Sequence, residues 1–319
     1  MKAVIIKLLV FVATFSLSLQ AQTPKISSLI EEANSKKFDL WDFTDFIGER
    51  IDSPEEIANF FYHWIRLNIE YDTQSYEDMR NEKITWKEYQ ERQDEYDVYE
   101  TRKAVCAGYA NLYKWFLEEL EVESEIISGH IRDDRNNYID LNEDDAFRHA
   151  WNAVKLNGEW ILVDTTWGSG QDEENSEYYY NIRPEWLINT HFPTESEWQL
   201  LDKPLSLEEF NNSKFVSSLW FQLGFIEAPK LYEDEAHYYF TFYDIESDWK
   251  VNLEFSNDNI NFYPVKVQQT VKQDGLVYYK FEKENIGNEA YFKVGLSMLE
   301  IMEDSYRVHK HTDLINFKK

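Results

Sequence analysis

The chain carries a single cysteine, Cys106, in surroundings that would make a thiol reactive. It stands near the start of AVCAGYANLYKWFL, where apolar residues recur every three or four positions, as on the buried face of a helix. A thiol at a helix N-terminus ionises below its ordinary pKa of about 8.5 and becomes a nucleophile. We therefore interpret Cys106 as a candidate nucleophile. Its own backbone N–H is a candidate oxyanion donor, and we expect Gly108 to leave room for a substrate backbone.

A second segment, HAWNAVKLNGEWILVDTTWG, supplies a histidine and an aspartate that can meet. Its Asn157-Gly158 pair is the strongest short-range signal for a two-residue hairpin turn. Counting back from this turn places His149 opposite Thr166 and Trp151 opposite Asp164. His149 and Asp164 then share one face as diagonal neighbours, with Cβ atoms roughly 7 Å apart, so their side chains can hydrogen-bond. A slip of one residue in the register would put them on opposite faces.

These three residues could form a Cys-His-Asp triad. In such a triad His149 takes the proton of the Cys106 thiol and later returns it, while Asp164 fixes the tautomer of the imidazole. Each residue alone has an ordinary alternative role: Cys106 as a small buried hydrophobe, His149 as a core or surface residue, Asp164 as the start of a turn. The mutually consistent geometry favours the catalytic interpretation.

The sequence patterns of the helices and strands that must position these residues predict an α+β domain followed by a β-rich region. The run from Ser53 opens with Ser-Pro-Glu-Glu and continues with helical apolar spacing, which predicts an amphipathic helix. Residues 72–103 are charge-rich and predict exposed helices or a long loop, and residues 171–214 a connecting segment. From Phe215 onward, short alternating runs separated by turn residues predict an Ig-like β-sandwich. We thus expect a signal peptide at 1–21, a catalytic domain with an N-terminal extension at 22–214 and an all-β domain at 215–319.

The segments around Cys106, His149 and Asp164 strongly resemble the transglutaminase-like superfamily. In that superfamily a Cys-Gly-Tyr-Ala helix start, a His-Ala-Trp-Asn strand and a Trp-x-x-x-Asp-x-Thr-Trp strand carry the triad. The motif THFPTESEWQLL is similar to the kyphoscoliosis-peptidase branch. The resemblance covers about residues 53–205. It implies a papain-like fold and members that hydrolyse peptide or amide bonds, cross-link glutamine to amines, or deglycosylate proteins.

Some features of that family have no clear counterpart in the sequence. The second oxyanion donor is a Trp in some members; the candidates are Trp64, which we expect in the core because it lies on an apolar helix face, and Trp86. The loop from Asp133 to Asp145 is acidic but lacks the spacing of a calcium loop, so we interpret it as solvated. We expect no metal or other cofactor, and we interpret the remaining lone histidines as structural: His63, His130 and His191.

Composition narrows the partners and the compartment. The 32 basic and 60 acidic residues give a net charge of −28, which disfavours nucleic acid and anionic membranes as partners. The first residues, MKAVIIKLLVFVATFSLSLQAQ, have the pattern of a cleaved secretory signal, and their apolar core is too short to span a bilayer. We therefore expect an exported bacterial-type protein, periplasmic or extracellular, with no membrane insertion after signal removal.

Two functions follow from these observations. The first is a thiol-dependent acyl-transfer enzyme that acts on peptide or glutamine amide bonds of a protein or peptide substrate, as a cysteine peptidase or amidase, or as a transglutaminase. Hydrolysis is slightly favoured, by family analogy alone. The alternative is a non-enzymatic secreted protein that binds proteins or glycans and uses the α+β domain as a scaffold. Its motivation is the sandwich itself and the many Tyr and Trp residues after position 170.

Overall fold

The structure is a computed structural model that describes residues 25–132, 148–170, 176–243, 245, 248–271, 275–302 and 305–319. The signal-like segment 1–21 and the acidic loop from Asp133 to Asp145 lie outside the described residues. The chain divides into two compact units, one of residues up to Ile126 with Ala150–Asn181, the other of Ile127–His149 with Ile182–Lys319. Strands β3 (Ser124–Ile131) and β4 (Arg148–Leu156) contribute residues to both units.

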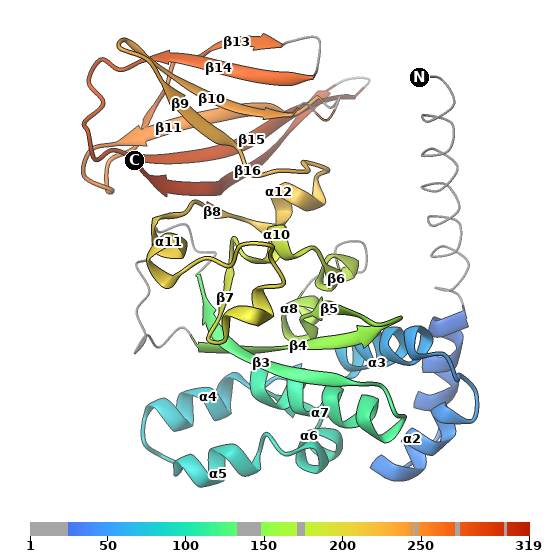
Figure 1. The fold of residues 1–319 in the computed structure, drawn as a ribbon. Helices are drawn as coiled ribbons and strands as arrows, with labels where there is room; N and C mark the ends of the chain where they lie inside the picture. Colours follow the sequence, from blue (N-terminus) through green and yellow to red (C-terminus); the bar gives the residue numbers. More distant parts are fainter. Residues whose placement is uncertain are drawn as a thin grey trace. The chain divides into compact units, whose positions relative to one another are not determined.

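The first unit is rich in helices (Figure 1). After a helical segment at residues 25–34 come α2 (Leu40–Gly48), α3 (Pro54–Asn68), α4 (Thr73–Arg80), α5 (Trp86–Glu91), α6 (Glu95–Thr101) and α7 (Cys106–Glu119). The predicted helix after Ser53 is confirmed: the Ser53 side chain accepts a hydrogen bond from the backbone N–H of Glu56 and caps α3. Two short parallel strands pair with each other, β1 (Glu70–Tyr71) and β2 (Lys103–Ala104). In the chain they precede and follow the largely exposed helices α4 to α6.

Aromatic side chains hold α3 and α7 together. Phe61 of α3 stacks on Phe116 of α7 with ring centroids 4.2 Å apart, and Phe43 of α2 lies edge-on to both rings. The Tyr113 hydroxyl donates a hydrogen bond to the carbonyl of Ala58. Burying such rings is worth roughly 1.5–3 kcal/mol each relative to exposure. The first residue of α7, Cys106, therefore begins a helix that is firmly packed along its length.

A five-stranded sheet has the order β6-β5-β4-β3-β7. Its remaining strands are β5 (Glu159–Val163), β6 (Tyr180–Ile182) and β7 (His191–Pro193). The register predicted from the hairpin turn is confirmed, since β4 pairs with β5 from Asn152 opposite Val163 to Leu156 opposite Glu159. Asn157 and Gly158 have φ angles of 53° and 86°, as a type I′ turn requires. Short helices follow β5 and β6: α8 (Thr165–Ser169), η1 (Glu177–Tyr179) and α10 (Pro184–Leu187).

The C-terminal region forms two antiparallel sheets, in the orders β13-β14-β10-β9 and β12-β11-β15-β16-β8. Rings from β10, β14 and β15 meet between the sheets: Tyr238 and Phe281 both lie about 6 Å from Phe292. The strands are β8 (Phe215–Val216), β9 (Lys230–Glu233), β10 (His237–Tyr243), β11 (Lys250–Ser256), β12 (Tyr263–Pro264), β13 (Gln268–Val271), β14 (Leu276–Glu282), β15 (Tyr291–Met302) and β16 (Ser305–Lys318). Short helices η2 (Ser196–Gln199), α11 (Leu207–Asn212) and α12 (Ser218–Gln222) precede most of them. The predicted α+β fold class is thereby confirmed.

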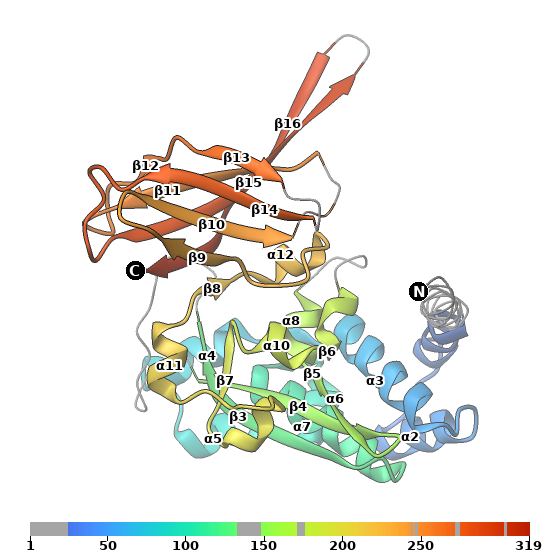
Figure 2. The ribbon, with the colours of Figure 1, turned by 45° about the horizontal axis from the view of Figure 1, so that its top comes forward.

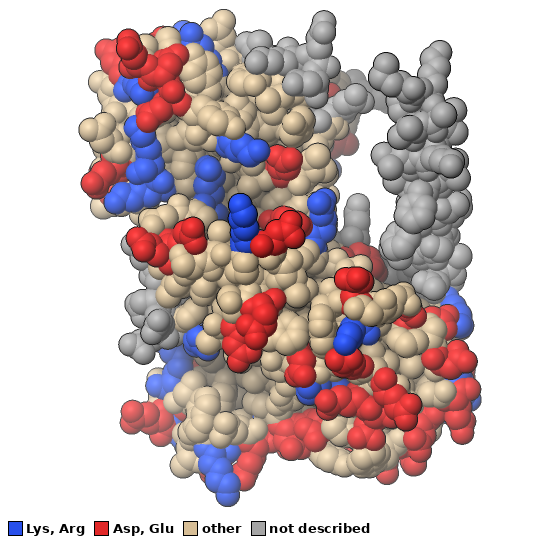
Figure 3. Space-filling view, viewed as in Figure 1, with Lys and Arg blue, Asp and Glu red and all other residues tan. Residues whose placement is uncertain are grey.

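Two surface features stand out. The ends of β15 and β16 project as a two-stranded arm beyond their sheet, because β15 pairs with β11 only as far as Ser297 (Figure 2). On the face drawn in Figure 3, acidic side chains gather over the helical region around α2, in keeping with the net charge of −28. None of the described helices combines the length and the apolar character needed to cross a membrane.

Candidate functional site

Cys106 is the first residue of α7 and is half-buried. The preceding residue, Val105, has the extended backbone of an N-cap and offers no side-chain acceptor to the helix. The first-turn N–H groups of α7 therefore keep their partial positive charge directed at this end of the helix, where it stabilises an anion such as a thiolate. The predicted location of Cys106 at a helix start is thus correct.

Gly108 does not leave space for a substrate, contrary to our expectation. A Cβ built on Gly108 would lie 2.6 Å from Oε1 of Gln93, 2.8 Å from Cβ of Ala104 and 2.9 Å from a methyl carbon of Val98. The room beside Gly108 is filled by the protein itself. Gln93 is buried there, and its Oε1 accepts a hydrogen bond of 2.9 Å from the backbone N–H of Val105. The glycine thus allows Gln93 to hold the backbone directly before Cys106.

Tyrosines lie within electrostatic range of the thiol. Burial raises the pKa of Tyr89 to about 12, and the negative charge of Cys106 adds to that shift. The pKa of Tyr71 is raised by the same two causes, with burial again the larger. Both hydroxyls are protonated at neutral pH, as tyrosine hydroxyls ordinarily are.

His149 and Asp164 come together as predicted, although the strand pairing does not continue to them. The β4–β5 ladder ends at Val163, and Thr166 lies in α8 rather than opposite His149. The reason is that Asp164 caps α8: its carboxylate accepts a hydrogen bond of 2.8 Å from the backbone N–H of Trp167 and turns the chain into a helix. Asp164 is fully buried and His149 is 6% exposed.

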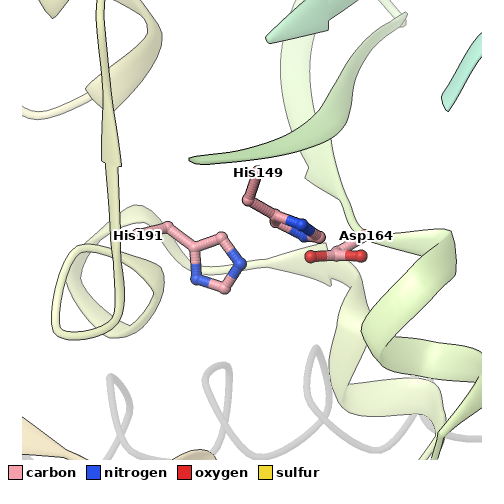
Figure 4. A group of neighbouring side chains, drawn as sticks. All are labelled: His149, Asp164 and His191. Atoms are coloured by element: carbon pink, nitrogen blue, oxygen red, sulfur yellow. The ribbon is translucent and has the colours of Figure 1, made fainter. Parts of the chain in front are cut away.

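The structure adds a third side chain to this pair, His191 at the start of β7. One ligand-type atom from each of His149, Asp164 and His191 lies within 4.8 Å of the other two, and all three residues are buried (Figure 4). The rings of His149 and His191 meet at a tilt of 62° with centroids 5.4 Å apart. This group does not include Cys106. We had interpreted His191 as a lone structural residue because the sequence shows no partner pattern around it. The structure brings it to the pair through the long-range pairing of β7 with β3.

The other candidate residues have roles away from this group. Trp64 is in the core, as expected, and its indole N–H donates to Asn34. Trp86 is 61% exposed on α5. Nε2 of His63 lies 3.0 Å from a carboxylate oxygen of Glu177, and His130 lies 3.1 Å from the guanidinium of Arg148.

A buried carboxylate beside an imidazole has a definite chemical use. It favours the tautomer whose other nitrogen carries a lone pair, and it stabilises the imidazolium once that nitrogen takes a proton. Each of these partners is held by secondary structure: His149 is the second residue of β4, and Asp164 follows β5 directly as the N-cap of α8. The arrangement can therefore act as a general base and then as a general acid.

Comparison with known proteins finds a similar family over part of the chain. Residues 43–165 match the model of the transglutaminase-like superfamily. The match includes α3, α7, β4, β5 and all three residues of the predicted triad.

Curated proteins are similar to part of the chain. The chain is 32% identical to kyphoscoliosis peptidase of Mus musculus over 184 residues, 55% of this chain and 26% of that protein. It is 29% identical to Hillarin of Drosophila melanogaster over 180 residues, 48% of this chain and 21% of that protein. The chain thus spans about a quarter of the length of these relatives or less. Among solved structures, a crystal structure of a TGase aligns with a TM-score of 0.30 and 17% identity, over 46% of this chain and 32% of that chain.

Proposed function

We propose that this protein is a thiol-dependent acyl-transfer enzyme in which Cys106 is the nucleophile, His149 the general base and acid, and Asp164 the residue that orients His149. The observation that carries the proposal is the buried approach of Asp164 to His149, in a transglutaminase-like domain whose single cysteine begins a helix. The buried carboxylate supplies the charge that an imidazolium needs away from water. The helix N-terminus supplies the field that a thiolate needs.

The reaction proceeds in two steps. The Cys106 thiolate attacks the carbonyl carbon of a peptide or glutamine amide, the C–N bond breaks, and the amine leaves with the proton from His149. The thioester that remains is attacked by water, which loses a proton to His149, and a carboxylic acid and the free thiol are released. If a primary amine attacks in place of water, the product is a new amide. We favour water as the acceptor, by analogy with the peptidase relatives.

Thiol reactivity gives the first test. Alkylation of the full chain with iodoacetamide at pH 6, followed by mass spectrometry, reads out Cys106 alone because the sequence has no other cysteine. We expect rapid labelling in the native protein and slow labelling in His149→Ala. The matched control is His63→Ala, which removes a buried histidine paired with Glu177 rather than with Asp164. Equal, slow labelling of all three proteins would refute an activated nucleophile.

The acceptor is tested separately. A peptide library containing glutamine is incubated with the enzyme in the presence and absence of a fluorescent primary amine, with Cys106→Ala as the control. We expect peptide cleavage or loss of ammonia that depends on Cys106 and needs no amine. Amine incorporation without hydrolysis would assign the protein to the transferases.

A second candidate function is recognition of a protein or glycan by the C-terminal sheets. The observation that favours it is the arm of β15 and β16, whose apolar side chains are solvent-exposed: Leu299, Ile301, Tyr306 and Val308. Scattered exposed apolar residues are ordinary, but a projecting ribbon that carries these four together with Met302 is typical of a binding surface. If Cys106→Ala retains every cellular effect of the protein, binding rather than catalysis is the function.

We further propose that the protein is exported, on the secretory pattern of residues 1–21. Mass spectrometry of the mature N-terminus tests this, since a chain that still begins at Met1 would contradict removal of a signal.

A further inference from the structure

The inference starts from His191, which the proposed catalytic mechanism does not use. His191 is 1% exposed, begins β7, and joins His149 and Asp164 in the buried group described above. Figure 4 shows the His191 ring with one nitrogen directed toward Asp164 and His149 and the other directed away. A catalytic pair needs no second imidazole at this place.

The neighbouring Thr190 contacts the Nδ1 nitrogen of His191. The Thr190 hydroxyl donates its one hydrogen to the carbonyl of Leu187 at 3.2 Å. Its oxygen also lies 2.8 Å from Nδ1 of His191. In the tautomer whose Nδ1 carries the proton, the Thr190 oxygen accepts from Nδ1–H and Nε2 carries a lone pair. An oxygen at Nδ1 is the arrangement found behind histidines that bind a metal through Nε2.

We propose that His149, Asp164 and His191 form a binding site for a divalent transition-metal ion of the Zn²⁺ type. Two imidazole nitrogens and one carboxylate oxygen are a donor set that Zn²⁺ and its neighbours prefer, whereas Ca²⁺ and Mg²⁺ prefer oxygen alone. The three ligands come from β4, from the end of β5 and from β7, so no short sequence motif announces them.

The dimensions agree with such a site. In a tetrahedral zinc centre with bonds of about 2.0–2.1 Å, ligand atoms are roughly 3.3 Å apart. The three ligand atoms here lie within 4.8 Å of one another, so side-chain rotations that bring them closer by up to about 1.5 Å complete the set. Zn²⁺ also keeps a fourth position for water or a thiolate in sites with three protein ligands.

Metal binding has a consequence that rests on the proposed function. A metal ion on His149 occupies the lone pair that would accept the proton of Cys106, so the same imidazole cannot serve as the general base. Zn²⁺ would then inhibit the enzyme reversibly, and a chelator would restore activity. This would make acyl transfer dependent on the zinc concentration of the compartment.

The test measures metal binding directly and needs no substrate. The full chain is titrated with Zn²⁺ by calorimetry and with Co²⁺ by visible absorption, in which tetrahedral Co²⁺ with nitrogen ligands gives intense bands. Thr190→Val keeps the shape of the side chain and removes the oxygen that holds His191; we expect its affinity to fall by about 10- to 100-fold. His191→Ala removes a ligand, and we expect a larger loss.

Two control variants separate this site from other histidines. His63→Ala removes a buried histidine outside the group, and His237→Ala removes a surface histidine that lies 3.3 Å from both Asp234 and Glu282. Both should bind Zn²⁺ as the unaltered chain does. If the unaltered chain and His191→Ala bind with equal affinity, or if binding is lost in His237→Ala, the proposal is wrong.

The outcomes also keep the metal site and the enzyme apart. Zinc binding that depends on His191, in a protein whose Cys106 is unreactive, would support the metal site and refute the thiol enzyme. Rapid Cys106 labelling that is insensitive to Zn²⁺, in a protein that binds no metal, would refute the metal site and leave the enzyme intact. Thermal unfolding of each variant shows that it is folded at the temperature of the titration.

Discussion

The carboxylate of Asp164 accepts a hydrogen bond of 2.8 Å from the backbone N–H of Trp167, so the side chain that approaches His149 also begins helix α8. One carboxylate oxygen is committed to the helix. The group is fully buried and cannot rotate toward solvent. The carboxylate of Asp164 is therefore held by secondary structure as well as by packing.

This double role gives the first prediction. Asp164→Asn retains an oxygen that can cap α8, so we expect its stability to change little while acyl transfer is lost, because a neutral amide no longer stabilises an imidazolium. Asp164→Ala removes the cap as well and should cost a further 0.5–2 kcal/mol or so. Thermal unfolding and iodoacetamide labelling at pH 6 measure the two effects. Full labelling in Asp164→Asn would contradict a role for the charge.

The second prediction concerns the tight packing around Gly168, which lies in the helix that Asp164 caps. A Cβ on Gly168 would overlap the hydroxyl oxygen of Tyr62, which is buried and donates a hydrogen bond to the carbonyl of Ser176. We expect Gly168→Ala to destabilise the fold by about 1–3 kcal/mol, as overpacking of a core does. Gly170→Ala is the matched control, because its Cβ would meet only the Trp167 carbonyl at 3.6 Å. Equal unfolding midpoints for the two variants would show that α8 shifts freely.

The third prediction concerns the effect of Gly108 on the reactivity of the Cys106 thiol. In Gly108→Ala the added Cβ displaces Gln93, whose Oε1 holds the backbone N–H of Val105 directly before Cys106. We expect the rate of Cys106 alkylation at pH 6 to fall well below that of the unaltered chain, at temperatures where circular dichroism shows the variant to be folded. Gln93→Ala should cause the same loss without the overlap. An unchanged alkylation rate in both variants would mean that Gln93 does not hold the helix start.

Glu177 predicts a dependence of stability on pH. The hydrogen bond and charge of His63 lower the pKa of Glu177 from its ordinary value of 4.5, although burial opposes the shift. A carboxyl group whose pKa is lowered by folding stabilises the protein above its unfolded pKa, and the gain is lost as the pH falls through the folded pKa. The side chain is 44% exposed, so we expect less than about 1 kcal/mol.

The measurement compares Glu177→Gln with the unaltered chain by thermal unfolding at pH 6 and pH 3. The difference in midpoint should be present at pH 6 and shrink at pH 3. Glu197→Gln, a change at an exposed glutamate, serves as the control and should show no such pattern. A difference that grows toward low pH would reverse the sign of the argument.

The sequence predicted those parts of the site that local rules determine. The two-residue turn sets the β4–β5 register, because each residue pair of the hairpin follows from the turn by counting outward. The approach of His149 to Asp164 could therefore be predicted from the sequence. The spacing of apolar residues likewise predicted the helix that Cys106 begins. These features depend on contacts between neighbours in the chain.

The parts that were missed depend on tertiary contacts. His191 reaches the site because β7 pairs with β3, at a separation along the chain that no periodicity spans. The space beside Gly108 is filled by the side chain of Gln93, which lies between helices α5 and α6. The ladder stops before Thr166 because a helix cap at Asp164 competes with strand pairing, and only the folded backbone decides between the two.

The Asn157-Gly158 turn has a practical consequence for engineering the protein. An exposed turn between two strands is a usual place to insert an affinity tag or a fluorescent domain. Here the two residues with positive φ determine which side chains of β4 meet the end of β5. An insertion that loosens the turn would let the strands slip by one residue and turn His149 to the opposite face, so a tagged protein could be folded and soluble yet inert.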